Sequence, residues 1–185
     1  SSGINAQSER LTEIGACIFA GVEVKKVFNT FVNPGMHIPE KITELTGIRD
    51  SDVADAPSEE QALRDFIAFA GNRPVIAHNA SFDMSFLGAV ASRHGIRYMP
   101  VVLDTLAMSR ALLPELKNHK LDVVSKHLDL PKFNHHRASD DAMVVQRIMG
   151  KFIPMLRARG AKTIDDIEGI CRSLQRTESG RSHHM

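Results

Sequence analysis

Two stretches of the sequence each place an aspartate in the first turn of an expected helix. Asp83 ends residues 77–83 (AHNASFD), and Asp141 lies within residues 135–142 (HHRASDDA), which also hold two histidines upstream of it. Two carboxylates with a nearby imidazole can hold a divalent metal ion and deprotonate a water molecule. These residue types therefore favour a metal-assisted hydrolytic site.

Asp141 falls on the apolar face of its expected helix. If that helix begins at Ser139, positions 141, 145, 148 and 152 share one face and hold Asp, Val, Ile and Phe. A buried charge without a partner is costly, so a bound metal ion would account for this carboxylate. A carboxylate near a helix N-terminus is also stabilised by the helix dipole and then needs no further role. This segment alone leaves both interpretations open.

Asp83 repeats the pattern, because positions 83, 86, 87 and 90 hold Asp, Phe, Leu and Val. It follows the end of an expected strand, where the active-site residues of α/β sheets gather. Asn79 or Ser81 could cap this helix, which explains part of the motif without any chemistry. Two inward-facing aspartates in equivalent places nevertheless favour metal binding.

The candidate general base is a histidine five residues before Asp141. His136 is expected on the loop that enters the helix, where it could reach a metal site and stay partly solvated, as a base titrating near neutrality requires. His135 is the alternative, and the spacing favours His136. His78, at the end of a strand, is expected to be structural.

The segments that must position these residues alternate between strands and helices. We expect strands at 12–20, 22–32, 74–77 and 101–103, the first two forming a hairpin, and helices at 39–45, 58–70, from 81, and at 106–113, 120–128, 139–152 and 163–174. Pro154 should break or kink the chain after Phe152. This order predicts a mixed α/β sheet with helices on its faces, although four strands are few for so much helix.

Composition bounds the class of protein. At 185 residues, the chain fits one domain, and its net charge of +1 excludes a strongly basic nucleic-acid coat but not an enzyme that holds backbone phosphates through metal ions. Cys17 and Cys171 lack metal-ligand spacing, which favours an intracellular, cytoplasmic location. No apolar run approaches the roughly 20 residues of a membrane span, so we expect no membrane partner.

With these residues assembled, the chain resembles the 3′–5′ exonucleases of the DEDDh (DnaQ-like) superfamily. Within that superfamily it is most similar to the proofreading exonuclease domains of PolC-type DNA polymerase III. The matching stretches cover nearly the whole chain in the family's order: 12–16 (TEIGA), 44–48 (ELTGI), 78–83 (HNASFD), 104–106 (DTL), 118–121 (NHKL) and 135–142 (HHRASDDA).

The resemblance implies an RNase H-like fold and two divalent cations, Mg²⁺ or Mn²⁺. Asp83 and Asp141 match the second and third motif aspartates and would bind these metal ions, and His136 matches the general base. The reaction would release nucleoside 5′-monophosphates one at a time from single-stranded DNA 3′ ends. The substrate-binding residues implied for the terminal nucleotide are Ser2, Gly3, Ile4, Asn79 and Phe82.

The family's first motif, Asp-x-Glu on the first strand, should end just before Ser1. That strand normally lies in the middle of the sheet, so we expect the first, central strand to be missing and the apolar edges of its neighbours to be exposed. We therefore predict an N-terminally truncated exonuclease domain at residues 1–174, inactive or nearly so and poorly stable alone. Residues 175–185 form a tail that resembles the return into a PHP domain, which implies polymerase and PHP regions as partners in the parent chain.

Three alternatives stay open at this point. The first is an RNA-directed exonuclease of the same superfamily, because single-stranded 3′ ends are gripped mainly by stacking and backbone contacts. The second is a catalytically inactive module that binds 3′ ends or a polymerase partner. The third, an HD-type phosphohydrolase, is disfavoured because the sequence contains no His-Asp dipeptide.

Overall fold

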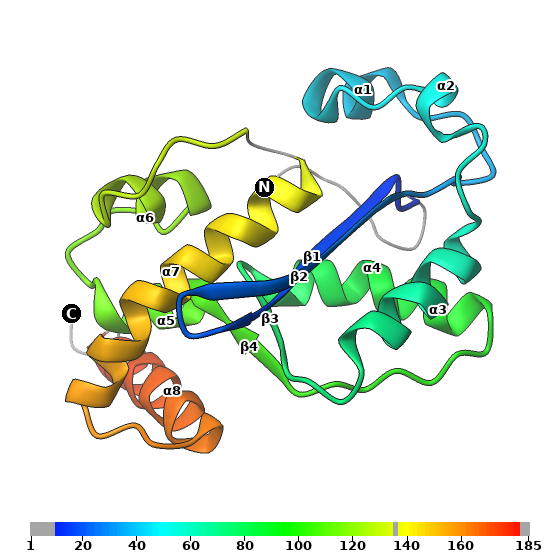
Figure 1. Ribbon diagram of the computed structural model, residues 1–185. Coiled ribbons are helices and arrows are strands. Elements are labelled where there is room, and N and C mark those ends of the chain that lie inside the picture. Colours follow the sequence, from blue (N-terminus) through cyan, green and yellow to red (C-terminus); the bar gives the residue numbers. More distant parts are fainter. Residues whose placement is uncertain (1–9, 135–136, 182–185) are drawn as a thin grey trace.

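Short strands and longer helices alternate along the chain. The computed structural model describes residues 10–134 and 137–181, and Figure 1 shows the arrangement of its elements. They are β1 (Glu13–Ala20), β2 (Glu23–Phe31), α1 (Glu40–Thr46), α2 (Asp50–Val53), α3 (Glu59–Ala70), β3 (Val75–Ala77), α4 (Ala80–Arg93), β4 (Val102–Asp104), α5 (Thr105–Leu112), α6 (Leu121–His127), α7 (Ala138–Ala158) and α8 (Ile164–Arg181). The predicted α/β class is confirmed, and the four-residue helix α2 is the one described element that was not predicted.

The four strands form two separate sheets. β1 and β2 are an antiparallel hairpin with Glu13 opposite Phe31 and an irregularity between Ile18 and Phe19, whereas β3 and β4 pair in parallel. Among the described residues, no ladder joins β1 to β3. This arrangement agrees with the expectation that the central strand is missing.

β1 separates two cores because its side chains alternate between them. Ile14 packs with Leu63 of α3 and Val90 of α4. Phe19 packs against the larger cluster that includes Ile148 and other residues of α7. Figure 1 shows α7 alongside the hairpin, with α3 and α4 toward the other end.

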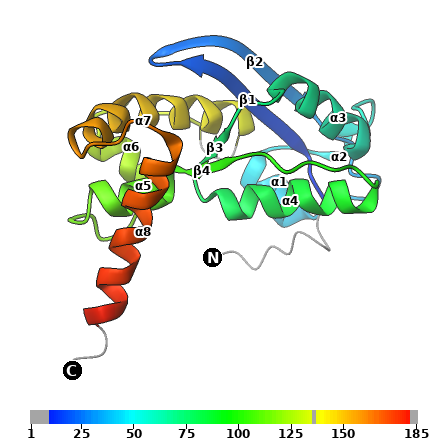
Figure 2. The ribbon, with the colours of Figure 1, turned by 90° about the horizontal axis from the view of Figure 1, so that it is seen from below.

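Two predictions of helix ends were wrong. α7 continues through Pro154 to Ala158 although the proline lacks a backbone donor. The reason is tertiary: Phe152 and Leu156, on either side of the proline, are both buried in the same core, and their burial outweighs the lost hydrogen bond. α8 continues past the predicted end at 174 to Arg181, leaving the body of the molecule at its C-terminal end (Figure 2). The predicted boundary between residues 1–174 and 175–185 thus falls inside a helix.

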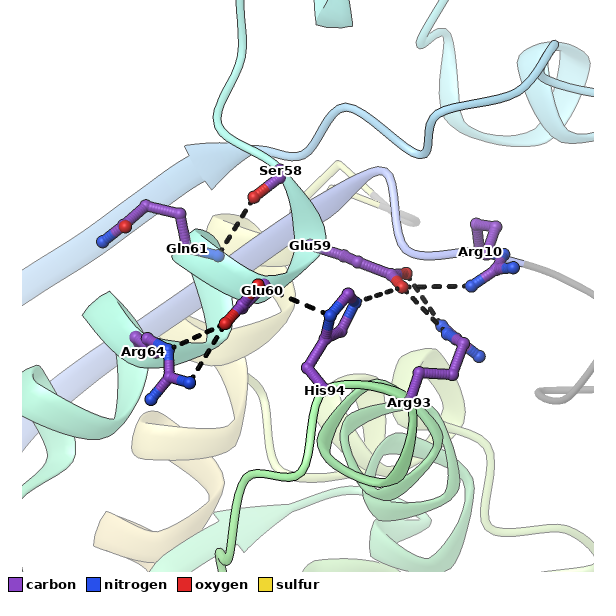
Figure 3. A network of polar contacts seen from close by, with 8 residues as sticks. All are labelled: Arg10, Ser58, Glu59, Glu60, Gln61, Arg64, Arg93 and His94. Carbon is purple, nitrogen blue, oxygen red and sulfur yellow. Dashed lines mark hydrogen bonds and ion pairs between the residues drawn. The ribbon is translucent and has the colours of Figure 1, made fainter.

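A buried glutamate joins α3 to α4. Glu59 accepts two hydrogen bonds from Arg93 and one from His94, and Arg10 donates a fourth at 3.0 Å (Figure 3). Burial alone would raise the pKa of Glu59, but the hydrogen bonds from Arg93 and His94 and the charges of both arginines outweigh it, so that pKa is lowered. The network ties the start of α3 to the C-terminal end of α4, at the opposite end of that helix from Asp83.

The start of α3 has half of a capping box. The Ser58 hydroxyl accepts the Gln61 N–H at 3.2 Å (Figure 3). The Gln61 side chain donates to Asp65 at 2.8 Å, one turn further along the helix.

Within residues 10–134 and 137–181, none of the helices is both long and apolar enough to cross a membrane.

Candidate active site

The turn between β3 and α4 fixes the helix that carries Asp83. Asn79 adopts a left-handed conformation (φ 66°), and its N–H donates to Oδ1 of Asp104 at 2.9 Å. The same oxygen accepts the N–H of Leu106 at 2.8 Å, and so caps α5. One carboxylate therefore holds the exits of both parallel strands, and Asp83 follows in the first turn of α4.

The predicted side-chain cap of α4 is wrong for Asn79. Asn79 is the N-cap residue, but its side chain makes no cap hydrogen bond among the described residues, and its Oδ1 accepts the Ser81 hydroxyl at 3.3 Å. The left-handed backbone explains this, because a side-chain cap needs an extended N-cap residue. Asn79 therefore turns the chain through its backbone and presents its side chain near the helix start.

Asp141 lies in the first turn of α7. Its N–H donates to the carbonyl of Arg137 at 3.0 Å, and its Oδ1 is buried. Val145, Ile148 and Phe152, on the same helix face, are all buried, as the sequence pattern predicted. The carboxylate thus stands at the end of an apolar stripe.

The two carboxylates interact electrostatically. Loss of hydration, together with the smaller effects of the charges on Asp141 and Asp104, raises the pKa of Asp83 to about 7, although a hydrogen bond from its own backbone N–H lowers it. Asp83 is nevertheless exposed to solvent, because it lies on the wall of an open cleft. Neighbouring protein atoms displace only part of the water around its carboxylate. The carboxyl groups of Asp83 and Asp141 therefore lie close enough in the cleft to affect each other.

The structure brings four predicted site residues into one cleft. Asp83, Asp141, Asn79 and Phe82 all line a cavity of about 1980 Å³, together with residues of both β1 and β3. Phe82 is partly exposed there and packs edge-on against Phe86, with ring centroids 5.2 Å apart. The cleft thus offers carboxylates beside an accessible aromatic ring.

Four other predicted site residues, and one alternative, lie outside the described residues. They are the proposed base His136, its alternative His135, and the substrate-pocket residues Ser2, Gly3 and Ile4. Arg137, the first described residue after the two histidines, directly precedes α7.

The donor set of the cleft suits a hard divalent cation. Mg²⁺ is usually bound by one or two carboxylates together with substrate phosphates, and Asp83 and Asp141 provide such oxygen ligands. Loss of hydration is the main cause of the raised pKa of Asp83, and a cation between the two carboxylates would offset both this loss and the smaller repulsion from Asp141. No group of three or more His, Cys, Asp or Glu side chains with metal-ligand geometry occurs in the described part of the chain.

His78 has the structural role that its position predicted. Its Nε2 lies 2.6 Å from the carbonyl of His119 and its Nδ1 lies 2.9 Å from the Thr105 hydroxyl. Because a carbonyl only accepts, Nε2 carries the proton and Nδ1 accepts from Thr105. Burial lowers the pKa of His78, which keeps the ring neutral.

Sequence reasoning missed Glu13. It is the first residue of β1, yet it contacts Arg137 and Ala138 at the start of α7. The partners lie 124 and 125 residues away, so no local spacing signals the contact. A charged residue at the start of an otherwise apolar strand was the available hint.

Comparison with known sequences agrees with this geometry. The sequence pattern of the RNase_T exonuclease family matches residues 2–149. The PolC-type DNA polymerase III of Caldanaerobacter subterraneus is 38% identical over 170 residues, which covers 92% of this chain and 12% of that protein. The PolC-type DNA polymerase III of Bacillus subtilis is 31% identical over 186 residues, which covers 100% of this chain and 13% of that protein. The chain therefore spans a small part of the length of these relatives.

Solved structures show the same fold. Exonuclease X in complex with 5′ overhanging duplex DNA has a TM-score of 0.67 at 22% identity, covering 86% of this chain and 90% of that one. The nuclease domain of 3′hExo, a DEDDh family member bound to rAMP, has a TM-score of 0.63 at 20% identity, covering 72% of this chain and 74% of that one. These likenesses confirm the RNase H-like fold of the DEDDh exonucleases. Together with the family pattern over residues 2–149, they show that this chain belongs to the RNase_T exonuclease family.

Proposed function

We propose that this chain is a metal-dependent 3′–5′ exonuclease domain that removes nucleoside 5′-monophosphates from DNA 3′ ends. The observation that carries the proposal is the pair of first-turn aspartates, Asp83 and Asp141, in one cleft and in electrostatic contact. The PolC-type relatives support a place within a larger DNA polymerase. From the family resemblance we further propose a proofreading role, polymerase and PHP regions as partners, and a cytoplasmic location.

Asp83 and Asp141 would hold the cations, two Mg²⁺ or Mn²⁺ ions by family resemblance. When bound, such ions lower the pKa of water and neutralise charge on the phosphate. His136, which precedes Arg137 in the sequence, would accept the proton of the attacking water. The aspartates would hold the cations at the first turns of α4 and α7, and the phosphate of the terminal nucleotide would bind there.

Phe82 and Asn79 would hold the terminal nucleotide. The Phe82 ring is accessible on the cleft wall, and stacking of a base on an aromatic ring contributes about 1–3 kcal/mol per base. Asn79 offers an amide near the same helix start. Ser2, Gly3 and Ile4 would complete this pocket from the N-terminal segment.

Activity of residues 1–185 alone is expected to be low, because only Asp83 and Asp141 among the described carboxylates of the cleft match the family motif set, which has four. A test is to graft an Asp-x-Glu strand before Ser1 and follow the stepwise shortening of 5′-labelled single-stranded DNA with Mn²⁺. Asp141→Ala in the grafted protein is the control. If the graft leaves the protein folded but inactive, the proposal is wrong.

A second candidate is a module that binds 3′ ends without cleaving them. The same shortage of carboxylates favours it. It predicts that labelled single-stranded DNA binds with equal affinity to the grafted and ungrafted proteins, without product in either. Parallel assays on RNA oligonucleotides separate a DNA-directed from an RNA-directed enzyme.

A further inference from the structure

Glu13 acts on α7 from across the fold. Its side chain is only 4% exposed, its Oε1 accepts the N–H of Ala138 at 2.9 Å, and its Oε2 accepts Nε–H of Arg137 at 3.0 Å. The first N–H groups of any helix lack partners within the helix. Arg137, the N-cap residue of α7, provides no side-chain cap of its own among the described contacts. Glu13 therefore replaces the missing local cap.

The same face of β1 contacts the first turn of α7 at two more points. Gly15 approaches so closely that a Cβ on it would stand 2.3 Å from the backbone of Ala138. The Sγ atom of Cys17 lies 3.7 Å from the carbonyl oxygen of Ala142. Residues 13, 15 and 17 occupy every second position of the strand, so they lie on the same face. β1 thus supports the helix start over its whole first turn.

Arg137 connects Glu13 to Asp141. The carbonyl of Arg137 accepts the Asp141 N–H, and the guanidinium of Arg137 is held by Glu13 and lies over the Phe31 ring, 5.6 Å from its centroid. We propose that Glu13 is a positioning residue that fixes the first turn of α7 and thereby holds the Asp141 carboxylate in the cleft beside Asp83. The inference rests on the proposed function of that cleft.

Glu59 is a matched control for this role. It is also a buried glutamate held by arginines, with a side chain 10% exposed, but it contacts the C-terminal end of α4 rather than α7. Loss of either glutamate removes charged hydrogen bonds from the same fold. Only Glu13 is joined to the helix start that carries Asp141.

The experiment compares Glu13→Ala and Glu59→Ala in the 185-residue chain by amide hydrogen exchange and by Mn²⁺ binding. For Glu13→Ala we expect protection of the Asp141 amide to fall about tenfold or more, since one charged hydrogen bond has at least that effect. Mn²⁺ affinity should fall by a similar factor. Glu59→Ala should leave both quantities within about twofold of the parent chain, even if its melting temperature drops as far as that of Glu13→Ala.

Equal changes in the two variants would overturn the proposal, because Glu13 would then be merely structural. If Glu13→Ala does not fold, Glu13→Gln keeps one acceptor for Ala138 and should give a smaller loss of the same sign. If the parent chain binds no Mn²⁺, the proposed metal site fails. The exchange of the Asp141 amide still decides the role of Glu13: selective loss in Glu13→Ala supports it, and unchanged protection overturns it.

Discussion

Gly15 and Ala138 bring a strand and a helix into backbone contact. An ideal Cβ on Gly15 would stand 2.3 Å from the carbonyl carbon of Ala138, far inside any normal contact. The atom it would meet belongs to the backbone, so no side chain can rotate to make room. Glycine at this position is therefore required for α7 to begin where it does.

Gly15→Ala should destabilise the domain by about 1–3 kcal/mol, the usual cost of inserting a methyl group into a packed interior. Urea unfolding measures the change. Gly88→Ala is the matched control, because a Cβ at Gly88 in α4 meets nothing within 4 Å. Alanine there should stabilise the helix by up to about 1 kcal/mol. Equal effects at the two glycines would contradict the close contact.

Asp83→Asn should separate stability from metal binding. The substitution removes one of two repelling carboxylates, so the metal-free protein should become more stable. Mn²⁺ affinity should fall at least as much as the 10–100-fold typical of changes next to a metal site. Thermal melting with and without Mn²⁺ measures both. Asp140→Asn, also in the first turn of α7, should change Mn²⁺ affinity far less.

His78 should make the protein sensitive to mild acid. Burial lowers the pKa of His78 in the folded state, so below the unfolded value of about 6.5 the unfolded chain binds a proton that the folded chain does not. This contribution to stability is fully present above pH 6.5 and is lost as the pH falls toward the folded pKa. His78 contributes up to about 1.4 kcal/mol per pH unit to the slope of the free energy of unfolding against pH, and this contribution should be absent in His78→Gln.

Urea midpoints of both proteins between pH 5 and 8 test the prediction. His127→Gln, which removes a partly exposed histidine paired with Glu115 on the surface, is the control. An unchanged slope in His78→Gln would mean that His78 is protonated in the folded state.

An extended peptide added in trans should bind the cleft between the two sheets. The cavity is lined by successive residues of β1 and by β3, and neither strand has a second ladder partner in the described part of the chain. A peptide of alternating apolar residues with Asp-x-Glu should raise the melting temperature and, with Mn²⁺, restore cleavage. The same peptide with Ala-x-Ala should raise only the melting temperature. A scrambled peptide that works as well would argue against a strand site.

Pro154→Ala should stabilise α7. Pro154 is exposed, so its replacement disturbs no core contact, and alanine restores a donor to the helix interior. The gain should be of the order of 1–3 kcal/mol, the range set by the usual cost of proline inside a helix. Chemical denaturation measures it. No gain would show that the backbone around Pro154 has already adjusted to the proline.

Local pattern was sufficient for most elements and for the helix faces that carry Asp83 and Asp141. The apolar residues on these two faces lie within a few turns of each aspartate, so the sequence alone predicts which side chains share a face with it. The continuation of α7 past Pro154 is decided by burial of Phe152 and Leu156, which no local rule contains. Glu13 lies beyond sequence reasoning for the same reason, because its partners are joined to it only by the fold.

The carboxylate of Asp104 couples the turns at the ends of β3 and β4. A single oxygen of its carboxylate accepts the N–H groups of Asn79 and Leu106, so the turns that start α4 and α5 share one anchor. Neither turn can open without breaking a bond at the oxygen that also holds the other. The two loops at the carboxyl ends of β3 and β4 therefore move as one body, and the position of Asp83 is tied to a helix that does not carry it.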